Sequence, residues 1–231
     1  MIADNLQRVQ ARIESAAQAC GRDPGTVALL AVSKTFSADA VRDAFAAGQR
    51  AFGENYIQEA VDKITALSDL RSQLQWHCIG PIQSNKTRLV AQHFDWAHTV
   101  DRLKIAQRLS EQRPALLPPL QVCIQVNVDG GETKSGVAPD EALELARTVA
   151  SLPRLRLRGL MCIPEPAPDF EAACAVLARA RGLLNALNAE GLGLDTLSMG
   201  MSADLEAAVH SGSTMVRVGS AIFGARDYNL A

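Results

Sequence analysis

The sequence predicts a single parallel (β/α)8 barrel on three observations. Apolar, strand-like runs alternate with amphipathic helical segments about eight times along the 231 residues. This alternation favours a parallel sheet, because neighbouring parallel strands need a crossover connection between them. The G-x-G-x-x-G loop of dinucleotide-binding open sheets follows none of the early strands. We therefore expect one α/β barrel domain over residues 1–231, with an open doubly wound sheet as the alternative.

An additional helix precedes the first predicted strand. Within residues 3–19, Leu6, Val9 and Ile13 recur at helical spacing, and Gly21 follows as a stop signal. The strand-like runs cover residues 27–33, 51–53, 75–79, 95–100, 120–126, 155–163, 196–199 and 214–218. The helical segments after them cover 38–47, 56–67, 85–92, 102–112, 139–150, 170–189 and 203–211. In a barrel, the carboxyl ends of all these strands open onto one face.

Composition and charge argue against several kinds of partner. A net charge of −2 and a pI near 6.1 leave no broad basic surface for nucleic acid or an anionic membrane. The amino end lacks the basic and apolar regions of a signal peptide, and no apolar run approaches a membrane span. We expect a cytoplasmic protein. Its cysteines form no C-x-x-C pair and are predicted to be reduced core residues: Cys20, Cys78, Cys123, Cys162 and Cys174.

A lysine lies at the end of the first predicted strand. Lys34 follows the apolar run 27–32 and precedes a helix-start signal at 35–39. The carboxyl ends of barrel strands carry the functional groups of such folds. Desolvation lowers the pKa of a lysine, and its neutral amine is a nucleophile, so Lys34 could hold an aldehyde as a Schiff base. The alternative is a solvated lysine at a strand end.

Small residues follow the seventh and eighth predicted strands, at Ser198, Gly200, Ser202, Gly219 and Ser220. Barrels commonly hold a phosphate at these two places, where backbone N–H groups and hydroxyls are free. A phosphate site combined with the lysine of the first strand suits a ligand that carries both an aldehyde and a phosphate. Pyridoxal phosphate has both groups. The alternative for either segment alone is ordinary helix capping.

Six segments resemble, in order, those of the pyridoxal-phosphate homeostasis proteins, the YggS/PROSC family. They are residues 31–35, 52–59, 76–86, 159–161, 198–202 and 217–224, and the resemblance covers essentially the whole chain. It implies a barrel of the alanine racemase N-terminal domain type, with pyridoxal phosphate held on Lys34. It also implies a cytosolic protein that carries or buffers this cofactor in vitamin B6 homeostasis without substantial turnover. Within these segments the expected cofactor-binding residues are Lys34, Asn55, Ile79, Pro81, Ser198, Met199, Ser202, Arg217, Gly219 and Ser220.

Two features favour a carrier over the alternative of a pyridoxal-phosphate-dependent amino-acid racemase or isomerase. Racemisation needs acid and base groups on both faces of the substrate, and the resemblance implies that the racemases supply one from a tyrosine of a further domain. This sequence ends at Ala231, and its only tyrosines are Tyr56 and Tyr228. The resemblance also places Arg217 against the pyridine nitrogen, where a guanidinium disfavours ring protonation. An alternative for Arg217 is a structural ion pair with Glu54 or another carboxylate.

The partners expected for a carrier are the cofactor and, as recipients, pyridoxal-phosphate-dependent apoenzymes. We expect a monomer, because the sequence lacks the domain through which the racemases dimerise. A regulatory protein with an unidentified protein partner is a further possibility.

Other candidate residues carry less chemistry. The four histidines, His77, His93, His98 and His210, never occur at metal-ligand spacing, and His77 is predicted to be an interior histidine. The loop 129–136 lacks the glycine that a P-loop needs before Lys134, so it predicts a flexible turn or an edge of the cofactor pocket. Lys86 is predicted to be solvated or to pack on a helix, with a second docking point for the cofactor as the alternative.

Overall fold

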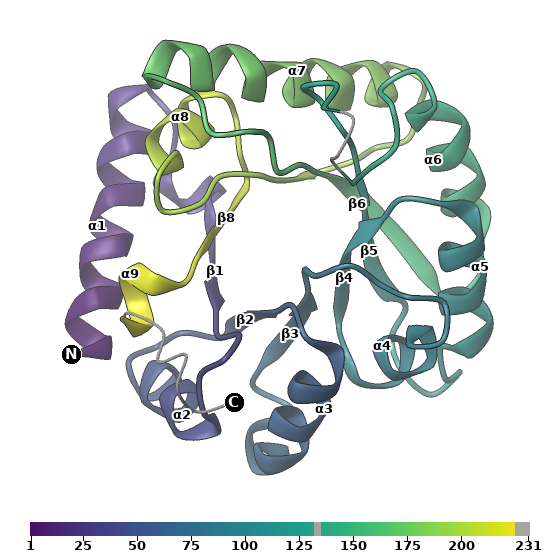
Figure 1. Cartoon of the computed structure of the whole chain (residues 1–231), viewed down its shortest axis with the longest axis horizontal. Coiled ribbons are helices and arrows are strands. Elements are labelled where there is room, and N and C mark those ends of the chain that lie inside the picture. The colour runs from purple at the N-terminus through teal and green to yellow at the C-terminus, as the bar shows by residue number, and fades with distance from the viewer. Residues whose placement is uncertain (132–134, 225–231) are drawn as a thin grey trace.

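A closed barrel of eight parallel strands forms the centre of the computed structural model, which describes residues 1–131 and 135–224 (Figure 1). Each strand pairs with the next one along the chain, and the last pairs with the first, with Leu30 opposite Arg217. The closed order rules out the open doubly wound sheet. The strands are β1 (Ala28–Val32), β2 (Ala51–Glu54), β3 (Gln75–Cys78), β4 (Trp96–Val100), β5 (Leu120–Gln125), β6 (Leu155–Met161), β7 (Thr196–Ser198) and β8 (Met215–Val218).

Helices cover the outside of the barrel and follow the strands in turn. They are α2 (Ala38–Ala46), α3 (Ile57–Ala66), α4 (Thr87–His93), α5 (Leu103–Gln112), α6 (Ala142–Ser151), α7 (Phe170–Ala189), α8 (Leu205–His210) and α9 (Ser220–Phe223). Two 3-10 turns, η1 (Pro24–Thr26) and η2 (Ser68–Leu70), lie in the connections. The predicted alternation is therefore confirmed. The short helix α9 after the last strand was not predicted, and the other main differences lie at the element ends. For example, α4 begins at Thr87 because residues 83–86 form a turn, in which Lys86 N–H donates to Gln83 O at 2.9 Å.

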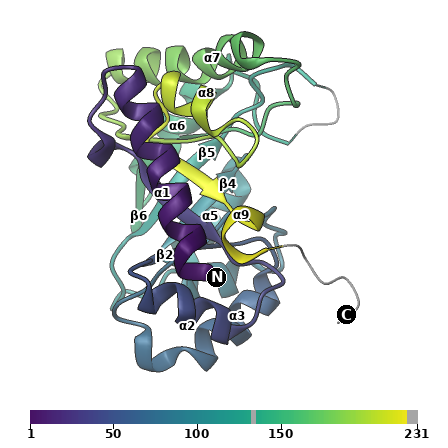
Figure 2. The ribbon, with the colours of Figure 1, turned by 90° about the vertical axis from the view of Figure 1, so that its left-hand side faces the viewer.

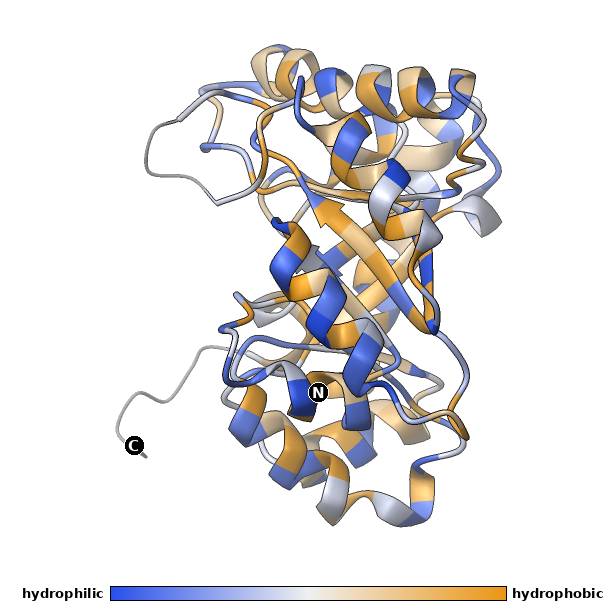
Figure 3. Cartoon of the chain, turned by 90° about the vertical axis from the view of Figure 1, so that its right-hand side faces the viewer, coloured by the Kyte–Doolittle hydropathy of each residue, from blue (hydrophilic) through white to orange (hydrophobic). Residues whose placement is uncertain are grey.

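The predicted additional helix is α1 (Ile2–Ala19). Its buried residues include Leu6, Val9 and Ile13, which recur on one face of the helix. This face packs on α8, α9 and α2, so α1 occupies the side of the ring beside β1 and β8 (Figure 1). Figure 3 shows the same amphipathic pattern in many of the helices, with polar and apolar stretches alternating along each ribbon.

Side chains alternate between the barrel interior and the helix layer along each strand. Leu30 and Val32 of β1 pack inside the barrel against Ile79 and Met215, whereas Ala31 belongs to the core between strands and helices. Lys34 lies two residues beyond Val32, in the turn that follows β1, and it is half-buried. Its position directly after the carboxyl end of β1 places Lys34 at the mouth of the barrel.

The carboxyl ends of the strands share one side of the molecule, because all strand pairs are parallel. This side faces the reader in Figure 1 and lies to the right in Figure 2, where β8 points toward α9. No helix among residues 1–131 and 135–224 is both long and apolar enough to cross a membrane.

All five cysteines are unpaired, but the prediction that they are core residues is right only for the buried Cys78, Cys123 and Cys162, because Cys20 and Cys174 are half-buried. Burial raises the pKa of the thiols of Cys78, Cys123 and Cys162 to about 12. These three residues are therefore unreactive thiols at neutral pH.

Candidate functional site

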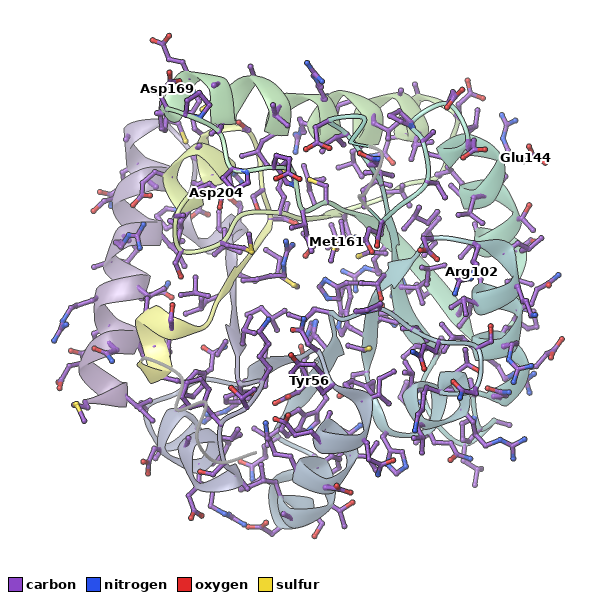
Figure 4. All side chains as sticks on the ribbon, in the orientation of Figure 1. Tyr56, Arg102, Glu144, Met161, Asp169 and Asp204 are labelled. Carbon is purple, nitrogen blue, oxygen red and sulfur yellow. The ribbon has the colours of Figure 1, made fainter. Side chains whose placement is uncertain are left out.

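Residues that follow several different strands meet at the mouth of the barrel. Figure 4 shows Tyr56, Met161 and Asp204 around the centre of the ring, whereas Glu144 and Asp169 lie on its periphery. Tyr56 follows β2, Met161 ends β6, and Asp204 follows β7. The fold thus brings together the segments in which the sequence predicted a site.

Lys34 lies in a tight turn between β1 and α2. Thr35 has a φ of 68°, in the left-handed region, where a β-branched residue is rare. The turn is held by two hydrogen bonds: Phe36 N–H donates to Ser33 O at 3.0 Å, and Thr35 N–H donates to Glu59 Oε1 at 2.7 Å. The backbone that carries Lys34 is therefore fixed by contacts within the turn and with α3.

A buried ion cluster connects β2 and α3 to this turn. Lys63 Nζ donates to Glu54 Oε1 at 2.6 Å, to Ser33 O at 2.8 Å and to Glu59 Oε1 at 3.2 Å. Ser33 Oγ also donates to Glu54 Oε1, at 2.6 Å. Burial raises the pKa of the Glu54 carboxyl, although Lys63 and Ser33 oppose that shift.

The sequence did not predict this cluster. The one local signal was the spacing of Glu59 and Lys63, four residues apart on a helix. The alternative pairing of Arg217 with Glu54 is wrong, because Glu54 contacts Lys63 and Ser33 instead.

Arg217 lies inside the barrel and is buried. Its Nη1 donates to Ser198 Oγ at 2.8 Å, and its Nη2 donates to Cys162 O at 3.0 Å. None of its hydrogen-bond partners in the described part of the chain is a carboxylate. Burial lowers the pKa of this guanidinium, but an arginine remains charged in proteins. Among the described residues, the barrel therefore holds a buried cation with no carboxylate hydrogen-bonded to it, and Asp204 acts on it only through its charge.

A chain of hydrogen bonds continues from Arg217 across the barrel interior. Ser198 Oγ lies 2.9 Å from His98 Nδ1, and His98 Nε2 lies 2.9 Å from His77 Nδ1. The ring of His77 stacks on Trp96, with the ring planes 11° apart. Burial lowers the pKa of His77 to about 3 and that of His98 well below its usual value. Both histidines are therefore neutral at physiological pH.

This chain of hydrogen bonds bears on the predictions made for His77 and Ser198. His77 is an interior histidine, as predicted, but its Nε2 is buried and has no partner in the described structure. Ser198 was expected to bind the cofactor. Its side chain is buried and contacts Arg217 and His98. In this arrangement, the hydroxyl of Ser198 orients the guanidinium of Arg217.

The two small-residue segments lie next to each other, because Arg217 N–H donates to Gly200 O at 2.9 Å. Gly200 has a φ of 95°, and a Cβ there would lie 2.4 Å from Ala208 Cβ, so only glycine fits. The N–H groups of Ser202, Gly219 and Ser220 donate no hydrogen bond within the described residues. A Cβ at Gly219 would lie 3.2 Å from Val32 O, at the end of β1. These unpaired N–H groups are suited to an anion.

The remaining predicted residues are placed differently from one another. Asn55 follows β2, and its Oδ1 is buried without a hydrogen-bond partner among residues 1–131 and 135–224. Ile79 packs in the apolar part of the barrel interior, and Pro81 is exposed. Met199 is buried in the core between the barrel and the helices, with Leu177 among its cluster, so its side chain points away from the mouth. Only the backbone of Met199 is available to a ligand there.

Other predicted features have no evident part in the site. Lys86 is half-buried at the start of α4. Around the loop 129–136, Asp129 Oδ2 accepts a hydrogen bond from Glu165 N–H at 2.7 Å. Lys134 and Tyr228 lie outside the described residues. Within the described ranges, no cluster of three or more histidine, cysteine, aspartate or glutamate residues could hold a metal ion.

Comparisons with known proteins show which proteins this chain resembles. Residues 5–227 match the family described as "Alanine racemase, N-terminal domain". The chain is 65% identical over 227 residues to a pyridoxal phosphate homeostasis protein of Pseudomonas aeruginosa, covering 98% of this chain and 96% of that one. It is 56% identical over 229 residues to the protein of the same name from Escherichia coli K12, covering 99% and 98%.

A solved structure is also similar. PipY of Synechococcus elongatus, determined with pyridoxal phosphate bound, is 37% identical with a TM-score of 0.84. The match covers 97% of this chain and all of that one.

Proposed function

The chain belongs to the pyridoxal phosphate homeostasis proteins, and from this premise we propose that it binds pyridoxal phosphate and carries or buffers it in the cell. The observation that carries the proposal is the placement of Lys34 directly after the carboxyl end of β1, at the barrel mouth, where two segments with N–H groups unpaired among the described residues also open. The close relatives are named homeostasis proteins rather than enzymes. The cofactor supplies an aldehyde that reacts with amines and a phosphate that anchors it.

The residues present fit this cofactor. Lys34 would hold it as a Schiff base, and the N–H groups of Ser202, Gly219 and Ser220 would bind its phosphate. Asn55 would use its unpartnered Oδ1. A buried oxygen without a partner is costly, so an incoming donor would relieve that cost.

Arg217 and the residues behind it would set the electronic character of the site. Arg217 would face the pyridine nitrogen, and its guanidinium disfavours a second positive charge there. Ser198 and His98 form the rest of the chain, and the histidine is neutral, so it does not offset the cation. We propose that this arrangement limits catalytic turnover. The alternative is a racemase or isomerase. Its second acid–base group would have to be Tyr56, which is the one tyrosine among the described residues and is 55% exposed.

Four further properties belong to the proposal. The chain would act as a single barrel domain over residues 1–231, as a monomer and in the cytoplasm. Its recipients would be pyridoxal-phosphate-dependent apoenzymes.

Transfer and exchange experiments test the carrier proposal. Loaded protein is mixed with an aminotransferase apoenzyme, and the recovery of aminotransferase activity is followed. A carrier restores activity without exchanging the α-hydrogen of amino acids in heavy water. Rapid α-deuterium incorporation by the loaded protein alone would support the racemase instead, and failure to restore the apoenzyme would contradict a carrier.

A further inference from the structure

Both peptide groups that adjoin Lys34 are held by the same side-chain cluster of α3. The carbonyl of Ser33, on the amino side of Lys34, accepts a hydrogen bond from Lys63 Nζ at 2.8 Å. The N–H of Thr35, on the carboxyl side, donates to Glu59 Oε1 at 2.7 Å. Because Lys63 also donates to Glu59, the two peptide groups are linked through one pair of side chains. Fixing both peptide planes fixes φ and ψ of Lys34.

The charges of this cluster are largely buried and are paired with one another. The side chain of Lys63 is 5% exposed, and its three ammonium N–H groups have three acceptors: Ser33 O, Glu54 Oε1 and Glu59 Oε1. Buried charges must be paired, and Lys63 and Glu54 compensate each other. Glu59 is the more accessible member, with its side chain 35% exposed. The cluster therefore consists of a buried ion pair, Lys63 with Glu54, and of the more exposed Glu59, which contacts the backbone of the turn.

The conformation of Thr35 shows why its hydrogen bond to Glu59 matters. A threonine with a φ of 68° is unfavourable unless the surroundings compensate. Its N–H bond to Glu59 is charge-assisted and short. This bond stabilises the bend that turns the chain away immediately after Lys34.

We propose that Glu59 and Lys63 are positioning residues, which hold the backbone of Lys34 so that its amine meets the carbonyl carbon of the bound aldehyde in one orientation. The inference rests on the proposed function and deepens it, because it assigns the rate of cofactor release to a cluster outside the barrel interior. Without the Glu59 carboxylate, the peptide group after Lys34 can rotate. The Lys34 amine is then no longer held in the orientation that the bound cofactor requires.

The test compares three single variants of the full chain loaded with pyridoxal phosphate. Glu59→Ala removes the acceptor for Thr35 N–H, and Glu59→Gln keeps an oxygen acceptor without the charge. Asp62→Ala removes a carboxylate from the exposed side of the same helix, where it accepts a hydrogen bond from Gln58 Nε2 at 3.3 Å. The readouts are the rate of cofactor release into excess aminotransferase apoenzyme, the absorption maximum of the bound cofactor and the melting temperature of the unloaded protein.

We expect Glu59→Ala to release the cofactor about five-fold faster, the effect of losing one hydrogen bond of ordinary strength, and to shift the absorption maximum. Glu59→Gln restores most of the native rate, and Asp62→Ala matches native protein. A native rate and spectrum in Glu59→Ala, or a Glu59→Gln variant as fast as Glu59→Ala, overturns the proposal. A lowered melting temperature with an unchanged rate of cofactor release also overturns it, because that result would indicate a purely structural role for Glu59.

A second variant keeps the test decisive if Glu59→Ala does not fold. Glu59→Met retains the length of the side chain and its apolar stem, and the same comparison applies to it. Failure of the proposed function looks different from failure of this inference. If native protein takes up no cofactor, the proposed function fails; if it loads normally and the Glu59 variants behave as native, only the positioning role fails.

Discussion

At the scale of single residues, the chain of Arg217, Ser198, His98 and His77 decides what the barrel interior can do. An arginine can only donate, so Ser198 Oγ accepts from it and its own proton is available to His98 Nδ1. A neutral His98 can then donate from Nε2 to His77 Nδ1. The polarity of the chain follows from the fixed charge of Arg217.

Ser198→Ala should therefore change the environment of the bound cofactor indirectly, through Arg217. The substitution removes the partner of Arg217 Nη1 and of His98 Nδ1, both buried, and should cost about 1–3 kcal/mol of unfolding free energy. It should also shift the absorption of bound pyridoxal phosphate, because the guanidinium is no longer oriented. Denaturant unfolding and absorption spectra check this, with the exposed Ser72→Ala as control. Native stability and spectrum in Ser198→Ala would contradict the orienting role.

At the scale of elements, α1 supports both segments of the proposed phosphate site. Arg12 of this helix donates to Ser202 O at 3.0 Å and pairs with Glu206 of α8. One turn from its start, Asn5 Nδ2 donates to Ile222 O of α9 at 2.8 Å. The helix that precedes the barrel thus connects the loop after β7 to the segment after β8.

We predict that Arg12→Ala and Asn5→Ala each weaken the binding of pyridoxal phosphate about three- to ten-fold, because the backbone N–H groups lose their fixed positions. Arg8→Ala, an exposed change on the same helix, is the control. Equilibrium titration of unloaded protein measures the dissociation constants. Equal affinities in Arg12→Ala, Asn5→Ala and Arg8→Ala would show that α1 does not support the site.

The sequence predicts elements well and contacts between elements poorly. The apolar runs identified every strand of the barrel, and they placed Lys34 correctly just after the carboxyl end of β1. The pairing of Glu54 with Lys63 depends on how α3 lies against the end of β2, although the two residues are only nine positions apart in the sequence, and no local pattern encodes it. Similarly, His98 and Ser198 lie 100 residues apart and meet only because the barrel closes.

At the scale of the whole molecule, the buried histidines make stability depend on pH. The pKa of His77 is lowered to about 3 and that of His98 is also lowered, mainly by burial, whereas both would titrate near 6.5 in the unfolded chain. Between these pH values the unfolded state binds more protons, so the free energy of unfolding falls as pH decreases from about 6.5. His77 contributes about 1.4 kcal/mol per pH unit in that window, and His98, whose pKa is also lowered, contributes in the same direction. Glu54, whose pKa is raised, contributes in the opposite sense.

Urea unfolding of unloaded protein at pH 7, 6 and 5 checks this prediction. His77→Phe, which keeps a ring against Trp96, should show a shallower dependence on pH than native protein. A native stability that is constant from pH 7 to pH 5 would contradict neutral, buried histidines in the folded barrel.

The central claim is that Lys34 holds the cofactor at the mouth of the barrel. The most direct measurement loads native protein with pyridoxal phosphate, reduces it with borohydride and maps the modified peptide by mass spectrometry. We predict a violet-absorbing band before reduction and a single reduced adduct on Lys34, with the band lost in Lys34→Ala. Absence of the band and of any adduct, or an adduct on another lysine of native protein, would contradict the account.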